Sequence, residues 1–230
     1  LTTTRLANGV IGVSSYILSQ MKSIGYFLDV PSHIIRNISS QPNQVKTPSS
    51  HHQNTVDCGC IIGFLGVLNE SKGILDLLFS FQQVARSSDR LLLAGNISMS
   101  SDMFYSLVNS DPRISYMGIV DRDVFFASID ILVVPSRVRE AFGLVAQEAR
   151  FRGVPTVVAN RGALPEISAD TLSAYLYDPD ESDGLSIVLK ALFANRNSWR
   201  RGVEISNSDY TKLKFGWGKS YETVLQNCVK

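Results

Sequence analysis

A buried strand, a loop and a helix follow one another in Asp130-Ile-Leu-Val-Val-Pro-Ser-Arg-Val-Arg-Glu140-Ala-Phe-Gly-Leu-Val-Ala-Gln-Glu148-Ala-Arg-Phe-Arg-Gly153. The apolar and mostly β-branched run from Ile131 to Val134 is typical of a strand that is buried on both faces. Good helix formers follow Gly143, and Gly153 with the next two residues, Val and Pro, predicts where that helix ends. The segment therefore places Glu140 in a loop and Glu148 on a helix.

The loop before this helix has the features of an anion site. In parallel α/β sheets, ligands bind beyond the carboxyl ends of the strands, where helix N-termini present backbone N–H groups. The N–H groups of Phe142, Gly143, Leu144 and Val145 lack acceptors in the first helical turn, and Gly143 has no side chain to keep a ligand away. Glu148 lies one turn after Leu144, beside the apolar stripe, where a carboxylate needs hydroxyl or N–H donors. Two carboxylates around a helix N-terminus suit a nucleotide sugar.

The spacing of the two glutamates, with Glu140-Ala-Phe-Gly-Leu144 at its front, resembles the retaining glycosyltransferases of the two-Rossmann-domain (GT-B) type, especially family four. The resemblance implies an α/β fold with a doubly wound parallel sheet, as in the GT-B C-terminal domain, and a remnant of a second Rossmann-like domain. It does not identify the sugar. Further motifs that carry it occur in the family's order: Val10-Ile-Gly-Val-Ser14, Ile35-Arg-Asn37, Phe64-Leu-Gly66, Lys72-Gly73, Leu93-Ala-Gly95, Gly118, Val134-Pro-Ser136, Gly153-Val-Pro155 and Leu164-Pro-Glu166.

The same resemblance implies transfer of a sugar from a nucleoside-diphosphate sugar to an acceptor hydroxyl, with retention at the anomeric carbon. Glu140 would hold hydroxyls of the donor sugar, and Lys72 would bring a cation to the phosphates, so these two are the candidate catalytic residues. Glu148 would hold the ribose hydroxyls, and the backbone at Val120 would line the base pocket. No cofactor or metal is expected. The predicted donor-binding residues are Gly66, Phe142, Gly143, Leu144, Val145, Glu148 and Val120.

Val67 departs from the family pattern, because family members usually carry an arginine directly after the glycine that corresponds to Gly66. One of two cations for the leaving diphosphate is therefore absent. This departure keeps a non-catalytic nucleotide-sugar-binding or scaffold protein open as an alternative. A sugar-nucleotide epimerase on the same fold also stays open, whereas a phosphorylase would need a pyridoxal phosphate lysine for which we find no site.

Composition gives no sign of a nucleic-acid partner, because 22 basic residues face 21 acidic ones. Residues 57–195 are acidic and the flanks are basic; the flanks are either ordinary charged surface or a face for an anionic acceptor or a lipid headgroup. A glycan, lipid-linked or small-molecule acceptor is expected. Three cysteines favour a reducing compartment, and no apolar run reaches about eighteen residues. We therefore expect a cytoplasmic protein, which in one interpretation lies at the inner face of a membrane. Since the chain begins with Leu1, we expect a fragment that lacks an upstream half.

Three sequence patterns have residue types that bind metals, but none of them predicts a metal site. The adjacent His51 and His52 would point apart in any regular structure, and Cys58-Gly-Cys60 lacks a second ligand pair. Asp121 and Asp123 form an Asp-x-Asp sequence like that of metal-dependent glycosyltransferases, but Asp121 is better explained as the N-cap of a helix over 124–127.

We expect four parts: the end of an acceptor-side domain (1–40), a linker (41–57), a nucleotide-sugar-binding domain (58–214) and a C-terminal helix that crosses back to the first domain (215–230). Trp217 is expected to anchor that helix in a core, and Glu166 to anchor its loop rather than to act in catalysis. Strands are predicted at 10–13, 32–35, 60–66, 91–94, 114–117, 129–134, 156–159 and 174–177, and helices at 16–24, 74–85, 124–127, 143–153, 182–193, 198–206 and 215–229.

Overall fold

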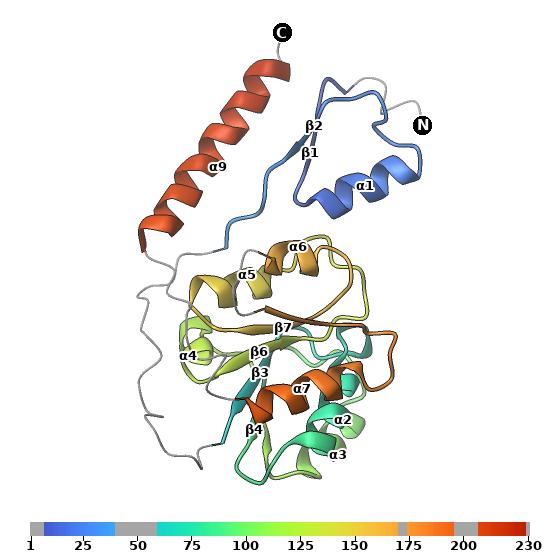
Figure 1. The fold of residues 1–230 in the computed structure, drawn as a ribbon, viewed down its shortest axis with the longest axis vertical. Helices are drawn as coiled ribbons and strands as arrows, with labels where there is room; N and C mark the ends of the chain where they lie inside the picture. Colours follow the sequence, from blue (N-terminus) through green and yellow to red (C-terminus); the bar gives the residue numbers. More distant parts are fainter. Residues whose placement is uncertain (1–6, 40–58, 170–173, 196–206, 229–230) are drawn as a thin grey trace.

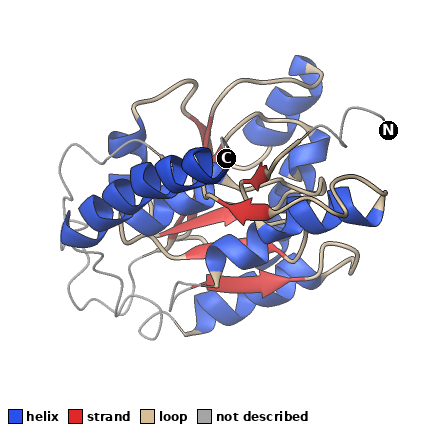
Figure 2. Cartoon of the chain, turned by 90° about the horizontal axis from the view of Figure 1, so that it is seen from above, coloured by secondary structure: helices blue, strands red, loops and turns tan. Residues whose placement is uncertain are grey.

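The computed structural model describes residues 7–39, 59–169, 174–195 and 207–228. The larger part is a six-stranded parallel sheet in the order β5-β4-β3-β6-β7-β8, and Figure 2 shows its strands flanked by helices. Its strands are β3 (Ile61–Leu65), β4 (Arg90–Ala94), β5 (Ile114–Tyr116), β6 (Ile131–Val134), β7 (Thr156–Ala159) and β8 (Ala174–Tyr177). The predicted doubly wound sheet is confirmed. Strands β6 and β7, which both have a neighbour on each side, are buried at every position, which explains their mostly apolar runs.

Helices cover both faces of this sheet. Figure 1 shows α5 and α6 between the sheet and the N-terminal segment, and α2 and α7 on the sheet's other side. The helices are α2 (Ile74–Val84), α3 (Ser101–Asn109), α4 (Arg122–Ala127), α5 (Leu144–Phe151), α6 (Leu164–Ser168) and α7 (Gly184–Ala194), with a short 3₁₀ turn η2 (Glu70–Lys72) before α2. The helix predicted for 198–206, the linker 41–57 and the two histidines lie outside the described residues.

The N-terminal segment forms a separate small unit. It contains β1 (Val10–Gly12), α1 (Ser15–Ser23) and β2 (Ser32–Ile34), and the two strands pair in parallel. These elements agree with the predicted ones to within one or two residues. None of the helices in the described ranges is long and apolar enough to cross a bilayer.

The last helix differs from its prediction. Helix α9 (Asn207–Cys228) begins well before Phe215. Trp217 is 41% exposed, so the prediction that it anchors the helix in a core is wrong. Among the side chains of this helix whose burial is described, Tyr210 and Val224 are buried. The Tyr210 hydroxyl donates to the carbonyl of Ser39 (2.9 Å), and its ring meets Phe151 edge-on.

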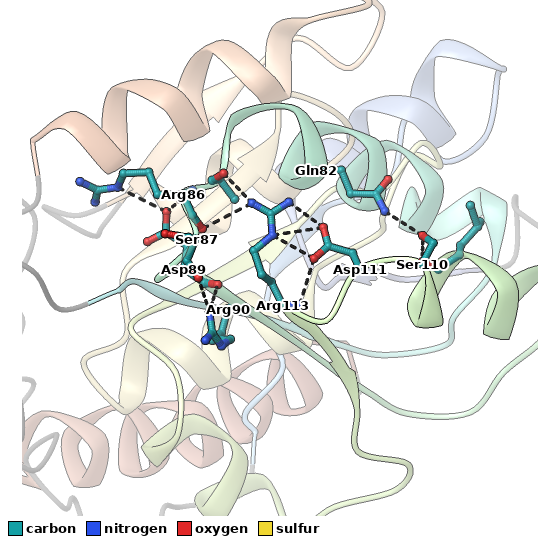
Figure 3. A network of polar contacts seen from close by, with 10 residues as sticks. Gln82, Arg86, Ser87, Asp89, Arg90, Ser110, Asp111 and Arg113 are labelled. Carbon is teal, nitrogen blue, oxygen red and sulfur yellow. Dashed lines mark hydrogen bonds and ion pairs between the residues drawn. The ribbon is translucent and has the colours of Figure 1, made fainter.

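A polar network closes the amino ends of β3, β4 and β5 (Figure 3). The buried Asp89 accepts hydrogen bonds from the backbone N–H of Cys60 and of Arg86, both at 2.8 Å. Arg113 pairs with Asp111 (2.6 Å) and donates to the carbonyl of Ala85 (2.6 Å). This network lies at the end of the sheet away from the predicted site.

Candidate functional site

The sheet has its topological switch between β3 and β6, because the chain runs outward from β3 to β5 and then crosses over to β6. In open α/β sheets this is where a crevice forms beyond the carboxyl ends of the strands. A cleft of about 570 Å³ lies there. All nine predicted site residues line it, together with Asn37, Phe64, Leu65, Val67, Gly95, Asn96, Ile119, Arg122, Val133, Val134 and Ser136. The structure thus brings the predicted residues together, while their roles stay predictions.

Glu140 and Lys72 meet in this cleft. Lys72 Nζ donates to Glu140 Oε1 at 2.6 Å, and the hydroxyl of Ser136 donates to the same oxygen at 2.9 Å. Both contacts use Oε1, so Oε2 is the oxygen of Glu140 that they leave for a ligand hydroxyl. Ser136 was not among the predicted site residues, although its position four residues before Glu140 at the end of a strand was a usable signal.

Two backbone features bring Lys72 to this position. The side chain of Asn69 caps the 3₁₀ turn by accepting from the N–H of Lys72 (2.9 Å). Gly73 follows with a φ of +74°, and a Cβ there would lie 1.8 Å from the carbonyl oxygen of Pro135. Only glycine allows this close approach, and it lets the 3₁₀ turn that carries Lys72 lie directly against the end of β6.

Helix α5 begins at the cleft with Gly143 as its N-cap. Gly143 has a φ of +97°, and its carbonyl accepts from the N–H groups of Ala146 and Gln147. The N–H groups of Leu144 and Val145 have no acceptor within the helix by its geometry. A Cβ at Gly143 would lie 2.6 Å from Leu164 Cδ2, so the Leu164 side chain would have to shift, in addition to the cost of the backbone conformation. Packing is a reason that the sequence did not reveal.

Glu148 is buried at the other end of the cleft, with its side chain 3% exposed. Its Oε1 accepts a hydrogen bond from Arg122 Nη1, and the Arg122 side chain is 55% exposed. Sequence reasoning missed Arg122 as a site residue. The available signal was weak: Arg122 directly follows the predicted N-cap Asp121, at the mouth of the predicted base pocket.

The two aspartates beside Arg122 have structural partners. Asp121 caps α4, as predicted, by accepting from the N–H groups of Asp123 and Val124. Asp123 pairs with the buried Arg152 (2.6 Å), whose guanidinium also lies over the ring of Phe126. Within the described part of the chain, no group of three or more His, Cys, Asp or Glu side chains is arranged to hold a metal ion.

Glu166 contacts the N-terminal segment. Its carboxylate accepts from the hydroxyl of Ser15 (2.6 Å) and from the N–H of Ser15 and Tyr16, and Arg36 lies 3.5 Å away. Burial raises the pKa of Glu166, but these hydrogen bonds outweigh it and hold the pKa below its usual value. Glu166 thus holds the N-terminal segment, whereas the sequence predicted that it anchors its own loop; that it takes no part in catalysis stays a prediction.

Several curated proteins with similar sequences are named as glycosyltransferases. The chain is 33% identical over 147 residues to O-antigen chain mannosyltransferase B of Escherichia coli, an alignment that covers 60% of this chain and 37% of the relative. It is 26% identical over 192 residues to lipopolysaccharide 1,2-N-acetylglucosaminetransferase of Salmonella typhimurium, covering 76% of this chain and 50% of the relative. The chain therefore spans about a third to a half of the length of these relatives.

Solved structures share the fold. HepE from Anabaena in complex with UDP superposes with a TM-score of 0.80 at 20% identity, covering 97% of this chain and 65% of that protein. Sucrose-phosphate synthase from Thermosynechococcus elongatus gives a TM-score of 0.74 at 19% identity, with 98% of this chain and 60% of that protein covered. Residues 59–195, more than half of the chain, match the family model described as glycosyl transferases group 1, and the chain belongs to that family.

Proposed function

We propose that this chain provides the donor-binding part of a glycosyltransferase that moves a sugar from a nucleoside-diphosphate sugar to an acceptor hydroxyl with retention. The observation that carries the proposal is the convergence of Lys72, Glu140, Glu148 and the start of α5 on one cleft at the switch point of the sheet. Family membership and the names of the relatives support a glycosyl transfer reaction. HepE, which has the same fold, was solved with UDP and with UDP-glucose.

In this proposal the cleft binds the donor along its length. Departure of the nucleoside diphosphate develops negative charge, and fixed donors that face it lower the barrier. Lys72 and the N–H groups of Leu144 and Val145 supply those donors. Glu140 accepts hydrogen bonds from the donor sugar. Glu148 accepts them from the ribose, which replaces the hydrogen bond from Arg122 to Glu148. Neither a cofactor nor a metal takes part, and the acceptor is a glycan, a lipid-linked sugar or a small molecule.

Calorimetric titration of the chain with UDP, GDP and ADP tests donor binding. One nucleotide is expected to bind, and Glu148→Gln is expected to weaken it about 10- to 100-fold, because a hydrogen bond to a charged group contributes about 1.5–3 kcal/mol. Glu222→Gln, an exposed substitution on α9, is the matched control and should bind as the wild type does. Binding of none of the three nucleotides, or equal binding by both variants, would contradict the proposal.

A second function remains a candidate because of Val67. Its apolar side chain is part of the cleft wall directly after Gly66, where family members usually place a cation. A protein that binds a nucleotide sugar without transferring it needs no second cation for a leaving group. Donor binding without release of UDP or GDP in the presence of acceptors would favour this binding function over the enzyme.

A further inference from the structure

The N-terminal segment contacts the loop that carries Glu140. Ser14 Oγ donates to the carbonyl of Ala141 at 2.6 Å and accepts from the N–H of Ile17 at 3.2 Å, so the same hydroxyl caps α1 and holds the loop. Ser14 is 0% exposed. Water cannot replace this bond without a change in the packing, since the hydroxyl is out of contact with solvent. Ala141 lies between Glu140 and Phe142, two residues of the cleft.

A second contact reaches the same loop through α6. Ser15 and Tyr16 donate to Glu166 on that helix. At the start of α6 the N–H of Ala163 donates to the carbonyl of Glu140 at 2.8 Å. A Cβ on Gly162 would lie 2.5 Å from the backbone nitrogen of Glu140, so the two backbones are in close contact. The start of α1 thus holds α6, and α6 holds Glu140.

Two successive carbonyls of the loop are therefore fixed from two directions. The carbonyl of Glu140 is held by α6, and that of Ala141 is held by Ser14. The dihedral angles between the two carbonyls are φ and ψ of Ala141, and fixing both carbonyls restricts them. The peptide after Glu140 is thereby held in place, which limits ψ of Glu140, and the rotamers open to the Glu140 side chain depend on that angle. The backbone directly after Glu140 is thus held in part by Ser14, whose hydrogen bond to Ala141 spans 127 positions of the sequence.

We propose that Ser14 is a positioning residue of the donor site, which sets the orientation of the Glu140 carboxylate and couples docking of the N-terminal segment to binding of the donor sugar. This inference rests on the proposed function for the role of Glu140. By thermodynamic linkage, a donor that needs the oriented Glu140 also strengthens the docking of residues 7–39 on the second part of the chain.

Hydrogen exchange in the full chain tests the positioning without any nucleotide. In Ser14→Ala, amides of residues 138–145 are expected to exchange several-fold faster than in the wild type, because local opening becomes easier. Ser19→Ala is the matched control: Ser19 lies exposed on the same helix, and its hydroxyl donates to the carbonyl of Tyr16. Amides of β3 and β4 report global unfolding and should be unchanged. Equal exchange of the loop in both variants would overturn the proposal.

Binding measurements test the consequence for the donor. UDP-glucose and GDP-mannose are titrated beside UDP and GDP, and the extra affinity for a sugar nucleotide over its bare nucleotide is the quantity compared. Ser14→Ala should reduce this extra affinity about 2- to 10-fold, the range of one ordinary hydrogen bond, with little change for the bare nucleotide. When Ser14→Ala is added to Glu140→Gln, the extra affinity for the sugar nucleotide should not fall further.

The two proposals fail in different ways. If the wild type binds none of these compounds, the proposed function fails, while the exchange experiment still decides the role of Ser14. If the wild type binds a sugar nucleotide and Ser14→Ala binds it equally well, the positioning role fails alone. Glu166→Gln is a second variant, for use if Ser14→Ala folds poorly. It loosens the contact between α1 and α6, and amides of residues 138–145 should exchange faster in it than in the wild type.

Discussion

Arg122 donates a hydrogen bond from its exposed guanidinium to the buried carboxylate of Glu148. The contact joins the start of α4 to the middle of α5 within the cleft wall. A buried carboxylate needs donors, because loss of one partner leaves the charge without compensation for its desolvation. Arg122 therefore stabilises the fold, and in the proposed function a ribose would compete with it for the same oxygen.

Removal of Arg122 should cost stability, and removal of both charges should restore it. We expect Arg122→Ala to lower the free energy of unfolding by about 1–3 kcal/mol, because Glu148 then loses a charged partner. The double variant Arg122→Ala/Glu148→Gln should recover most of this loss, since no buried charge is left. Urea denaturation of the four proteins in this cycle measures the effect. If the double variant is as unstable as the sum of the single variants, the two residues are not energetically coupled.

A cation at position 67 should strengthen nucleotide binding. Val67 is 40% exposed in the cleft wall, so a longer side chain there can reach the space that the proposed function assigns to the diphosphate. Val67→Arg is expected to tighten UDP binding about tenfold in calorimetry, because a charge-assisted hydrogen bond contributes about 1.5–3 kcal/mol. The gain should shrink as salt is raised. Val67→Leu controls for apolar contact, and a gain of the same size in that variant would contradict the electrostatic explanation.

Local patterns were enough to predict much of the sheet and the cleft. The strand over 131–134 and the following helix have strong signals, and the distance from Glu140 to Glu148 is set by one loop and one helical turn. The structure brings both glutamates to one cleft because the chain between them has little freedom. Lys72 could be predicted to join them because β3 and β6 are neighbours in a doubly wound sheet.

Contacts between elements that are distant in sequence could not be predicted. The bond from Ser14 to Ala141 spans 127 residues, and nothing in either local sequence indicates it. Trp217 shows a related limit. It lies seven residues from both Tyr210 and Val224, so all three share one stripe of α9, yet only the outer two are buried. Helical spacing gives the stripe, whereas burial depends on what the helix packs against at each point.

Gly143 should tolerate alanine less well than Gly118 does. Both have positive φ, +97° and +71°, so both substitutions incur backbone strain of about 1–3 kcal/mol. A Cβ at Gly143 also meets Leu164 at 2.6 Å, whereas a Cβ at Gly118 has nothing within 4 Å. The clash should add about 1–3 kcal/mol to the destabilisation by Gly143→Ala in urea denaturation. Equal losses in the two variants would mean that Leu164 moves aside without cost.

The pair of Asp111 and Arg113 should make stability depend on acid pH at the end of the sheet away from the cleft (Figure 3). The hydrogen bond from the Arg113 side chain holds the pKa of Asp111 below its usual value of 3.8, against the opposing effect of burial. A carboxyl whose pKa is lowered by folding stabilises the protein fully above its unfolded pKa, and this contribution is lost as pH falls through the folded pKa.

The stability difference between the wild type and Asp111→Asn should therefore be constant from pH 7 down to about pH 5 and shrink below 3.8. Urea denaturation across this range measures it, with Asp102→Asn, an exposed substitution on α3, as the control. Nucleotide affinity at pH 7 should be unchanged in Asp111→Asn, because the network lies at the amino ends of the strands and the cleft at their carboxyl ends. A difference that grows as pH falls would contradict the assignment of a lowered pKa to Asp111.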